Sequence, residues 1–372
     1  MVDDRRKGRF GKGRNDRPEG KFNSMDGRKD KLDSHKKGRL DSKYPKNPIT
    51  LDRRTILENI NAEPEWVKKL DKNPITYLIM KCSPITTLNM LKNVYQMKHP
   101  HPLYALAEKN TFSHLKLKQL ISQGAKSLLA QEDEVINRDM RFFSQLQLLH
   151  QIDERGGNRH IAKVRYHIVE FMRFQNDDGR FPMYYHHHAH ALRILLKLGI
   201  QGNRLIDRGI NWVIKRQRDD GGWIHRANVP TGKSIDKIPS CIWTTAEIAA
   251  LLSEKSGFKK SKELHNACEF LLANIEKDNF STLLPDANAW NQFSITSDSN
   301  LMFAGGTLKV LEILVRAGYN PSNPQFKKLY EWFITKQMDD GMFPMVAGKM
   351  PIANEAVSVR ALALIHAVES TR

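Results

Sequence analysis

The sequence repeats one short turn, and this repetition constrains the fold more than any other feature. The pattern Gln-x-Asp-Asp-Gly-x-aromatic occurs at 175–181, 217–223 and 337–343. Each copy ends one amphipathic, helix-like stretch and leads into another. Such a helix pair is too short to bury its own apolar face, so neighbouring pairs must stack. The chain is therefore predicted to be a helical repeat protein.

The spacing of the turns defines the repeat unit. A decayed copy begins at Asn274, and an acidic stretch at Gln131 resembles another. Successive first residues (Gln131, Gln175, Gln217, Asn274, Gln337) are separated by 44, 42, 57 and 63 residues. The unit is therefore one helix pair in slightly more than 40 residues, with insertions in the last two intervals.

The residues of the turn have a mechanical interpretation. Glycine after a helix end adopts the left-handed conformation that other residues enter only at a cost. Aspartate accepts hydrogen bonds from the exposed amides of a turn. The Gln amide can bond across the loop, and the aromatic ring provides an apolar anchor. We therefore interpret the Asp-Asp pairs as structural and not as catalytic acids.

Apolar periodicity predicts helices along most of the chain. The N-terminal part is less regular, with prolines near helix starts, where they are tolerated. The predicted helices span 53–61, 64–71, 74–81, 85–95, 101–108, 114–131, 160–175, 185–198, 204–217, 242–252, 262–274, 300–316, 324–337 and 354–368.

Composition separates a basic tail from the helical part. Residues 1–47 contain 16 Lys/Arg and 8 Asp/Glu, a net +8, which leaves +10 of the formal +18 for the rest. This segment has almost no aliphatic residues, so we predict a disordered tail. It is a solubilising segment or an electrostatic tether to nucleic acid or another acidic partner. We expect one helical domain over 48–372, with 48–135 divergent and 136–372 clearly repetitive.

The chain has only three cysteines, and we find neither an apolar leader nor a long apolar run in its sequence. These features favour a cytoplasmic protein without a membrane span or a disulfide framework.

The turns and the helix pairs between them resemble the terpenoid cyclase and protein prenyltransferase superfamily. The match is clearest from 198 to 223 and from 317 to 343. The resemblance implies an all-α fold, an α/α toroid of two concentric helix rings around a central cavity. It also implies an apolar ligand in that cavity, such as an isoprenoid, a lipid or a peptide.

The catalytic motifs of the superfamily are largely missing. Neither Asp-x-Asp-Asp nor Asp-Asp-x-x-Asp occurs, which disfavours terpene cyclisation. The segment from Gly232 to Trp243 resembles part of the zinc site of protein prenyltransferases. Cys241 matches its cysteine, but Pro239 stands at the aspartate position, and the last inner helix begins without a histidine.

Candidate site residues cluster at the predicted starts of inner helices. His186 and His190 are spaced i, i+4 and share a helix face, a geometry that can bind a metal. If the toroid closes, other helix starts would converge on them. We therefore select Cys241, His187, His190 and Glu355 as catalytic candidates, Tyr184, Tyr185, Trp243 and Asn300 as residues at the cavity rim, and Cys241, His186, His190 and Asp298 as metal ligands, with zinc as the implied metal.

Three functions remain open from the sequence. The first is a prenyltransferase-like repeat protein without assigned activity that binds an apolar ligand in its cavity. The second is a metal-dependent, prenyltransferase-like enzyme that uses Cys241 and the histidine cluster. The third is a nucleic-acid-associated factor tethered by its basic tail.

Overall fold

The computed structural model divides the chain into two units, Met1–Asn47 and Pro48–Arg372. The residues that the structure describes all belong to the second unit, so the tail prediction lies outside them. They are 53–113, 117–122, 138–226, 229, 231–276, 293–296, 303–345 and 352–370. These residues are mostly helical, which confirms the all-α class.

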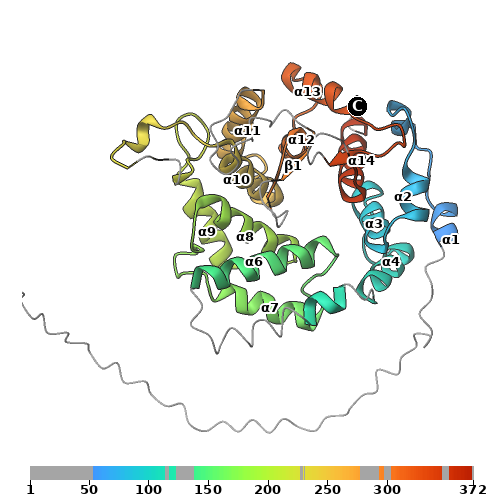
Figure 1. Ribbon diagram of the computed structural model, residues 1–372, viewed down its shortest axis with the longest axis horizontal. Helices are drawn as coiled ribbons and strands as arrows, with labels where there is room; N and C mark the ends of the chain where they lie inside the picture. The colour runs from blue at the N-terminus through green and yellow to red at the C-terminus, as the bar shows by residue number, and fades with distance from the viewer. Residues whose placement is uncertain are drawn as a thin grey trace, which may run out of the picture. The chain divides into compact units, whose positions relative to one another are not determined.

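Helices follow one another along the described part of the chain (Figure 1). The N-terminal group consists of α1 (Arg53–Glu58), the 3₁₀ helix η1 (Glu65–Lys69), α2 (Ile75–Lys81), α3 (Pro84–Asn89) with its π-helical extension η2 (Met90–Val94), and α4 (Pro102–Ser113). The repetitive group consists of α6 (Arg138–Glu154), α7 (Ala162–Met172), α8 (Tyr185–Lys197), α9 (Arg204–Ile214), α10 (Ile242–Glu254), α11 (Lys262–Asn274), α12 (Thr307–Arg316), α13 (Pro324–Ile334) and α14 (Glu355–Glu369).

Two short antiparallel ribbons interrupt the helical pattern. Strand β1 (Ile295–Thr296) pairs with β2 (Ala304–Gly305), and β3 (Pro344–Met345) pairs with β4 (Ile352–Ala353). The prediction that a helix begins near residue 300 is therefore wrong. The helix begins at Thr307, because Gly306 has φ of +89° and is not helical. Most of the helix predicted over 114–131 lies outside the described residues.

Alternate helices of the repetitive group contact one another in series. Helix α8 packs against α6 and α10, and α12 packs against α10 and α14. The intervening helices α7, α9, α11 and α13 each pack on the helix that precedes them in the chain. The apolar faces of the pairs form one continuous hydrophobic core. This is the stacking that helix pairs of this length require.

The N-terminal helices contact both ends of this series. Helix α14 packs against α3 and η2. At the other end, Gly156 follows α6 and adopts φ of +76°, and a Cβ there would lie 2.8 Å from Ile85 Cδ1 and 3.1 Å from Thr111 Cγ2. Glycine therefore permits the end of α6 to approach α3 and α4 closely.

The three turns confirm the structural interpretation of their sequence. Gly179, Gly221 and Gly341 have φ of +84°, +83° and +84°. In each turn the second aspartate accepts a backbone amide hydrogen two residues later. The glutamine side chain donates to the carbonyl of the turn glycine, at 2.7 Å from Gln175, 2.8 Å from Gln217 and 2.7 Å from Gln337.

The same glutamine Nε2 atoms also reach the next helix pair. Gln175 donates to Leu205 O at 3.0 Å, and Gln217 donates to Glu263 O at 2.7 Å. Both carbonyls lie in the first turn of the following odd-numbered helix. Gln337 donates to Lys72 O at 2.6 Å, just before α2. The last turn is therefore bound to the N-terminal helices as the earlier turns are bound to their successors.

The aromatic residue of each turn is bound by the fourth residue of the α-helix that follows the turn. These helices are α8, α10 and α14. The backbone N–H of Phe181 donates to His188 Nδ1, that of Trp223 to Thr245 Oγ1, and that of Phe343 to Ser358 Oγ. All three rings are fully buried.

None of the described helices combines the length and the apolar character needed to cross a bilayer.

Candidate functional site

Corresponding positions of the core helices carry ionisable side chains. The sixth residues of α8, α10, α12 and α14 are His190, Glu247, Glu312 and Arg360. An α-helix completes one turn every 3.6 residues. Side chains at the same position, counted from the start of each helix, therefore point in the same direction when the helices pack side by side. The helix register therefore brings these four groups to one side of the core helices.

Two of these groups, His190 and Glu247, form a buried cluster with Lys309, the third residue of α12. Lys309 Nζ pairs with Glu247 Oε1, and His190 Nδ1 lies 3.3 Å from Glu247 Oε2. The side chains of Glu247 and His190 are each 1% exposed and that of Lys309 is 5% exposed. Because the three residues come from α10, α8 and α12, the cluster joins three helices.

The protonation states in this cluster follow from burial and charge. Burial lowers the pKa of His190 to about 4, although Glu247 opposes this effect. His190 is therefore neutral near pH 7, with Nδ1–H donating to Glu247. Burial alone would raise the pKa of Glu247, but Lys309 and His190 outweigh it, and the net pKa is lowered. Burial lowers the pKa of Lys309 to about 8, again against the attraction of Glu247.

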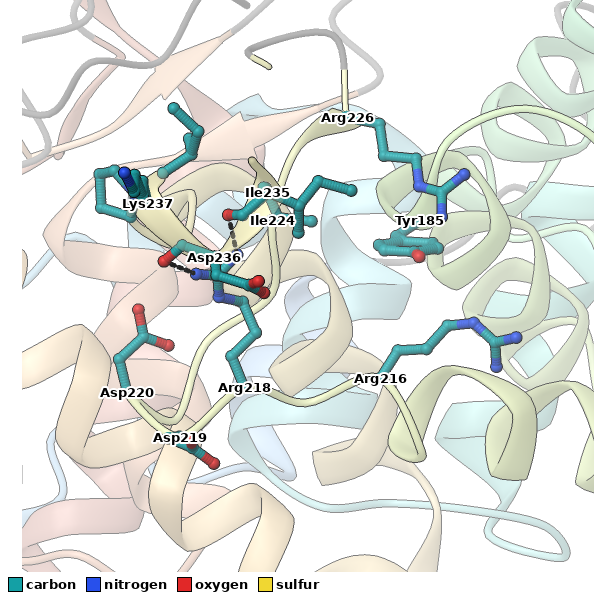
Figure 2. A pocket seen from close by; sticks show the side chains of 12 residues that line it. Tyr185, Arg216, Arg218, Asp219, Asp220, Ile224, Arg226, Ile235, Asp236 and Lys237 are labelled. Carbon is teal, nitrogen blue, oxygen red and sulfur yellow. Dashed lines mark hydrogen bonds between the residues drawn. The ribbon is translucent and has the colours of Figure 1, made fainter. Parts of the chain in front are cut away.

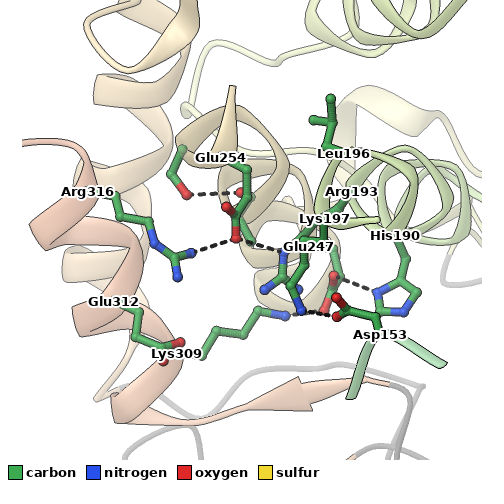
Figure 3. A network of polar contacts seen from close by, with 12 residues as sticks. Asp153, His190, Arg193, Leu196, Lys197, Glu247, Glu254, Lys309, Glu312 and Arg316 are labelled. Carbon is green, nitrogen blue, oxygen red and sulfur yellow. Dashed lines mark hydrogen bonds and ion pairs between the residues drawn. The ribbon is translucent and has the colours of Figure 1, made fainter. Parts of the chain in front are cut away.

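Further ion pairs extend the network beyond these three helices (Figure 3). Arg360 forms a bidentate pair with Glu312, with distances of 2.8 and 2.6 Å. Glu254 accepts from Arg316 at 3.0 Å and lies 3.8 Å from Arg193 Nε. Lys197 pairs with Asp153 of α6. Charged groups from five core helices thus face one another in the described part of the chain.

A cavity of about 530 Å³ adjoins this network. Its lining contains more cationic than anionic side chains. The Lys/Arg residues are Lys92, Arg155, Arg193, Lys197, Lys309 and Arg360, and the acidic residues are Glu108, Asp153 and Glu154. Leu88, Ile194, Val357 and Val359 add apolar wall. A space of this size matches small-molecule pockets. The cavity can hold a ligand with both an apolar part and a negative group.

The predicted histidine cluster does form, but inside the protein. His186, His187 and His190 all contact the ring of Phe303, with centroid distances of 5.2, 5.4 and 4.9 Å. His225, a residue that the sequence reasoning did not select, stacks on His186 at 4.8 Å. Burial lowers the pKa of His187 to about 3 and the pKa of His186 well below its usual value. These imidazoles are neutral at physiological pH.

The cluster does not assemble a metal centre from the described residues. Among those residues, no group of three or more His, Cys, Asp or Glu side chains is placed to hold a metal ion. Cys241 is the N-cap residue of α10, and its N–H donates to Trp223 O at 2.8 Å. The predicted ligand Asp298 and the rim residue Asn300 lie outside the described residues.

Other predicted site residues have structural contacts. Glu355 accepts hydrogen bonds from Ser83 N, Ser83 Oγ and Thr86 Oγ1, at 3.1, 3.0 and 2.6 Å. It therefore caps the start of α3, and these bonds lower its pKa against the effect of burial. Trp243 is buried in the core, 1% exposed. Tyr184 is 40% exposed and its ring contacts that of His225 at a tilt, and Tyr185 lines a separate surface pocket.

The charged residues of the buried network were not predicted from the sequence. Glu247, Lys309, Glu312 and Arg360 have no motif around them. A signal was nevertheless present, because each lies at the third or sixth position of a helix that begins after a repeat turn or a ribbon. Aligning the helices by their starts would have placed these groups in one layer.

Comparison with protein-family models and with curated protein sequences finds no match to this chain.

Proposed function

We propose that the protein is a ligand-binding α/α toroid of the prenyltransferase and cyclase type. The serial contacts of the core helices support this arrangement, and so does the bond from Gln337 to Lys72, which links the last repeat to the N-terminal helices. The proposed role is to hold a small amphiphile that carries a phosphate or carboxylate group.

One observation carries this proposal: the cavity has six Lys/Arg side chains and three Asp/Glu side chains in its lining. Four of the cations already pair with carboxylates. Lys92 and Arg155 have no carboxylate partner among the described residues, so a ligand anion can pair with them. The sequence favoured an apolar ligand, and the apolar wall accommodates that part. The charged lining supports an anionic head group in addition.

Dodecyl phosphate is a suitable probe, with binding to the full chain measured by isothermal titration calorimetry. We expect saturable binding. Lys92→Ala with Arg155→Ala should raise Kd about tenfold, because Lys92 is exposed and Arg155 is half-buried, and each charge contributes about 1 kcal/mol or less. Ala356→Trp should abolish binding, because this exposed residue lines the cavity and its replacement would fill the space.

Dodecanol and dodecyltrimethylammonium serve as matched ligands without the negative charge. If either binds as tightly as dodecyl phosphate, the anionic requirement is wrong. If Ala356→Trp leaves dodecyl phosphate binding unchanged, the ligand does not occupy this cavity. Circular dichroism of each variant establishes that its fold is retained.

The metal-dependent transferase receives no specific support. Cys241 is the N-cap residue of α10, and the histidines pack on Phe303.

A further inference from the structure

A second pocket lies on the surface, where the turn at 217–223 meets the loop that follows it. Its volume is about 770 Å³. Figure 2 shows arginines and a tyrosine converging on one side of it, and Asp219 and Asp220 on the other. The charged lining residues are Arg216, Arg218, Arg226, Lys237, Asp219, Asp220 and Asp236.

Part of this lining holds the loop together. Arg218 donates from its guanidinium to Ile235 O at 3.1 Å and to Asp236 O at 3.3 Å. Asp220 accepts from Ser240 N at 3.2 Å and Ser240 Oγ at 2.7 Å. These residues shape the pocket, and their polar groups are already engaged.

The other side combines exposed guanidinium groups with aromatic rings. Tyr185 and Trp212 meet edge to face, with centroids 5.4 Å apart. The guanidinium carbon of Arg216 lies 3.9 Å from the centroid of the Trp212 ring, and that of Arg226 lies 5.9 Å from that of Tyr185. The guanidinium carbon of Arg180 also lies near the Trp212 ring, 5.6 Å from its centroid. We call Arg180, Tyr185, Trp212, Arg216 and Arg226 the arginine–aromatic surface.

The cations of this surface remain available to a ligand. Arg216 and Arg226 are exposed, and neither pairs with a carboxylate among the described residues. Arg180 lies 3.9 Å from Asp178, an exposed and therefore weak contact. Arg216 donates from Nη1 to Trp212 O at 2.6 Å. Its other N–H groups can donate to phosphate oxygens, because a guanidinium over a ring presents its N–H groups at its edge.

We propose that the arginine–aromatic surface binds single-stranded nucleic acid. Single strands are recognised by stacking of unpaired bases on aromatic or guanidinium planes and by cationic contacts to phosphates. Arg216 and Arg226 would contact phosphates, and the partly exposed ring of Tyr185 or the stacked guanidinium groups would contact bases. An acidic peptide would use the charges but not the rings. The formal net charge of +18 strengthens attraction to a polyanion.

The test uses the full chain and a fluorescein-labelled twelve-nucleotide oligouridylate, with affinity measured by fluorescence anisotropy over a range of salt concentrations. Arg216→Ala with Arg226→Ala should weaken binding about tenfold or more and make the slope of log K against log salt shallower by about 1 to 2. Tyr185→Leu should weaken binding about tenfold with the salt slope unchanged, and Tyr185→Phe should retain affinity.

Lys163→Ala with Arg165→Ala is the matched control, because it removes two exposed charges from α7 and leaves the remainder of the chain unchanged. This control should keep most of the affinity. Equal losses in the two double variants would mean that only net charge matters, which overturns the site. Absence of binding by the unaltered chain also overturns it. So does equal competition by a polyglutamate peptide together with no effect of Tyr185→Leu, since that result defines a surface for acidic peptides.

Discussion

Glu247 is a buried carboxylate whose charge depends on residues of two other helices. Lys309 and His190 supply its partners, and all three side chains are almost fully buried. A buried ion pair is stabilising only relative to the same site with one partner removed. We therefore infer that the cluster specifies how α8, α10 and α12 pack more than it adds net stability.

Removal of the cation alone should be costly. We expect Lys309→Met to lower the free energy of unfolding by about 3–5 kcal/mol, because it leaves Glu247 charged, buried and without its main partner. Lys309→Met combined with Glu247→Leu should recover most of this loss. Urea unfolding followed by circular dichroism measures both.

Lys328→Met is the control for this experiment. Lys328 and Glu276 form an exposed pair, with side chains 70% and 56% exposed, so its removal should cost less than about 1 kcal/mol. If Lys309→Met costs no more than this control, Glu247 is not held by the buried pair.

At the scale of the element, the repeat turn has two separate requirements. Gly221 must adopt positive φ, and it must also leave room, because a Cβ there would lie 2.5 Å from Asn266 O. Gly232 also has positive φ, at +79°, but a Cβ there would meet no atom within 4 Å. The two glycines therefore separate backbone strain from steric contact.

Gly232→Ala should cost about 1–2 kcal/mol from backbone strain alone. Gly221→Ala should cost about 1–3 kcal/mol more, because the added methyl group displaces α11. Thermal and urea denaturation of the two variants provide the comparison. Equal costs would show that the contact between the turn and α11 relaxes freely.

The turn glutamines join successive helix pairs, and Gln337 joins the last pair to the N-terminal segment. Its Oε1 accepts from Lys72 N at 3.1 Å and its Nε2 donates to Lys72 O at 2.6 Å. We expect Gln337→Met to cost about 1–3 kcal/mol and to accelerate hydrogen exchange at the Lys72 amide.

Gln217→Met removes the corresponding bonds to Gly221 O and Glu263 O in another repeat and is the matched control for Gln337→Met. It should reduce stability by a similar amount without a local effect on the Lys72 amide. If both variants accelerate exchange of that amide equally, the N-terminal contact has no local role.

For the whole described unit, the buried histidines predict a strong dependence of stability on pH. Burial lowers the pKa values of His187, His188 and His190 to about 3, 4 and 4 from an ordinary value of 6.5. Between pH 6.5 and 4 the unfolded chain binds more protons at these positions than the folded chain. Stability from these groups is therefore fully present above pH 6.5 and is lost as pH falls toward 4.

We expect the free energy of unfolding to decrease by up to about 4 kcal/mol per pH unit within this window from three histidines. Urea denaturation at several pH values measures the slope. His190→Gln should reduce the slope by about one proton, whereas the exposed-site variant His160→Gln should leave it unchanged. A flat profile between pH 6.5 and 4 would contradict the burial of these imidazoles.

The repeat was sufficient to predict the helical fold. Glycine, aspartate and glutamine at fixed places in a turn act on the neighbouring backbone, and the structure confirms each of these roles. The helix starts after the turns were also predictable, because periodicity and turn residues are local signals. The start of α12 was not, because a ribbon and the non-helical Gly306 precede it.

The contacts at the candidate site were less predictable from the sequence than the helical fold, because they depend on tertiary structure. The sequence by itself determined that His186, His187 and His190 would share a helix, because all three lie in one periodic apolar stretch that follows a repeat turn. Only the packing of α8, α10 and α12 decided that His190 would meet Glu247 and Lys309, which are separated from it by 57 and 119 residues in the chain. Local patterns encode turns and faces, whereas the pairing of charges across helices depends on register and burial that no single segment contains.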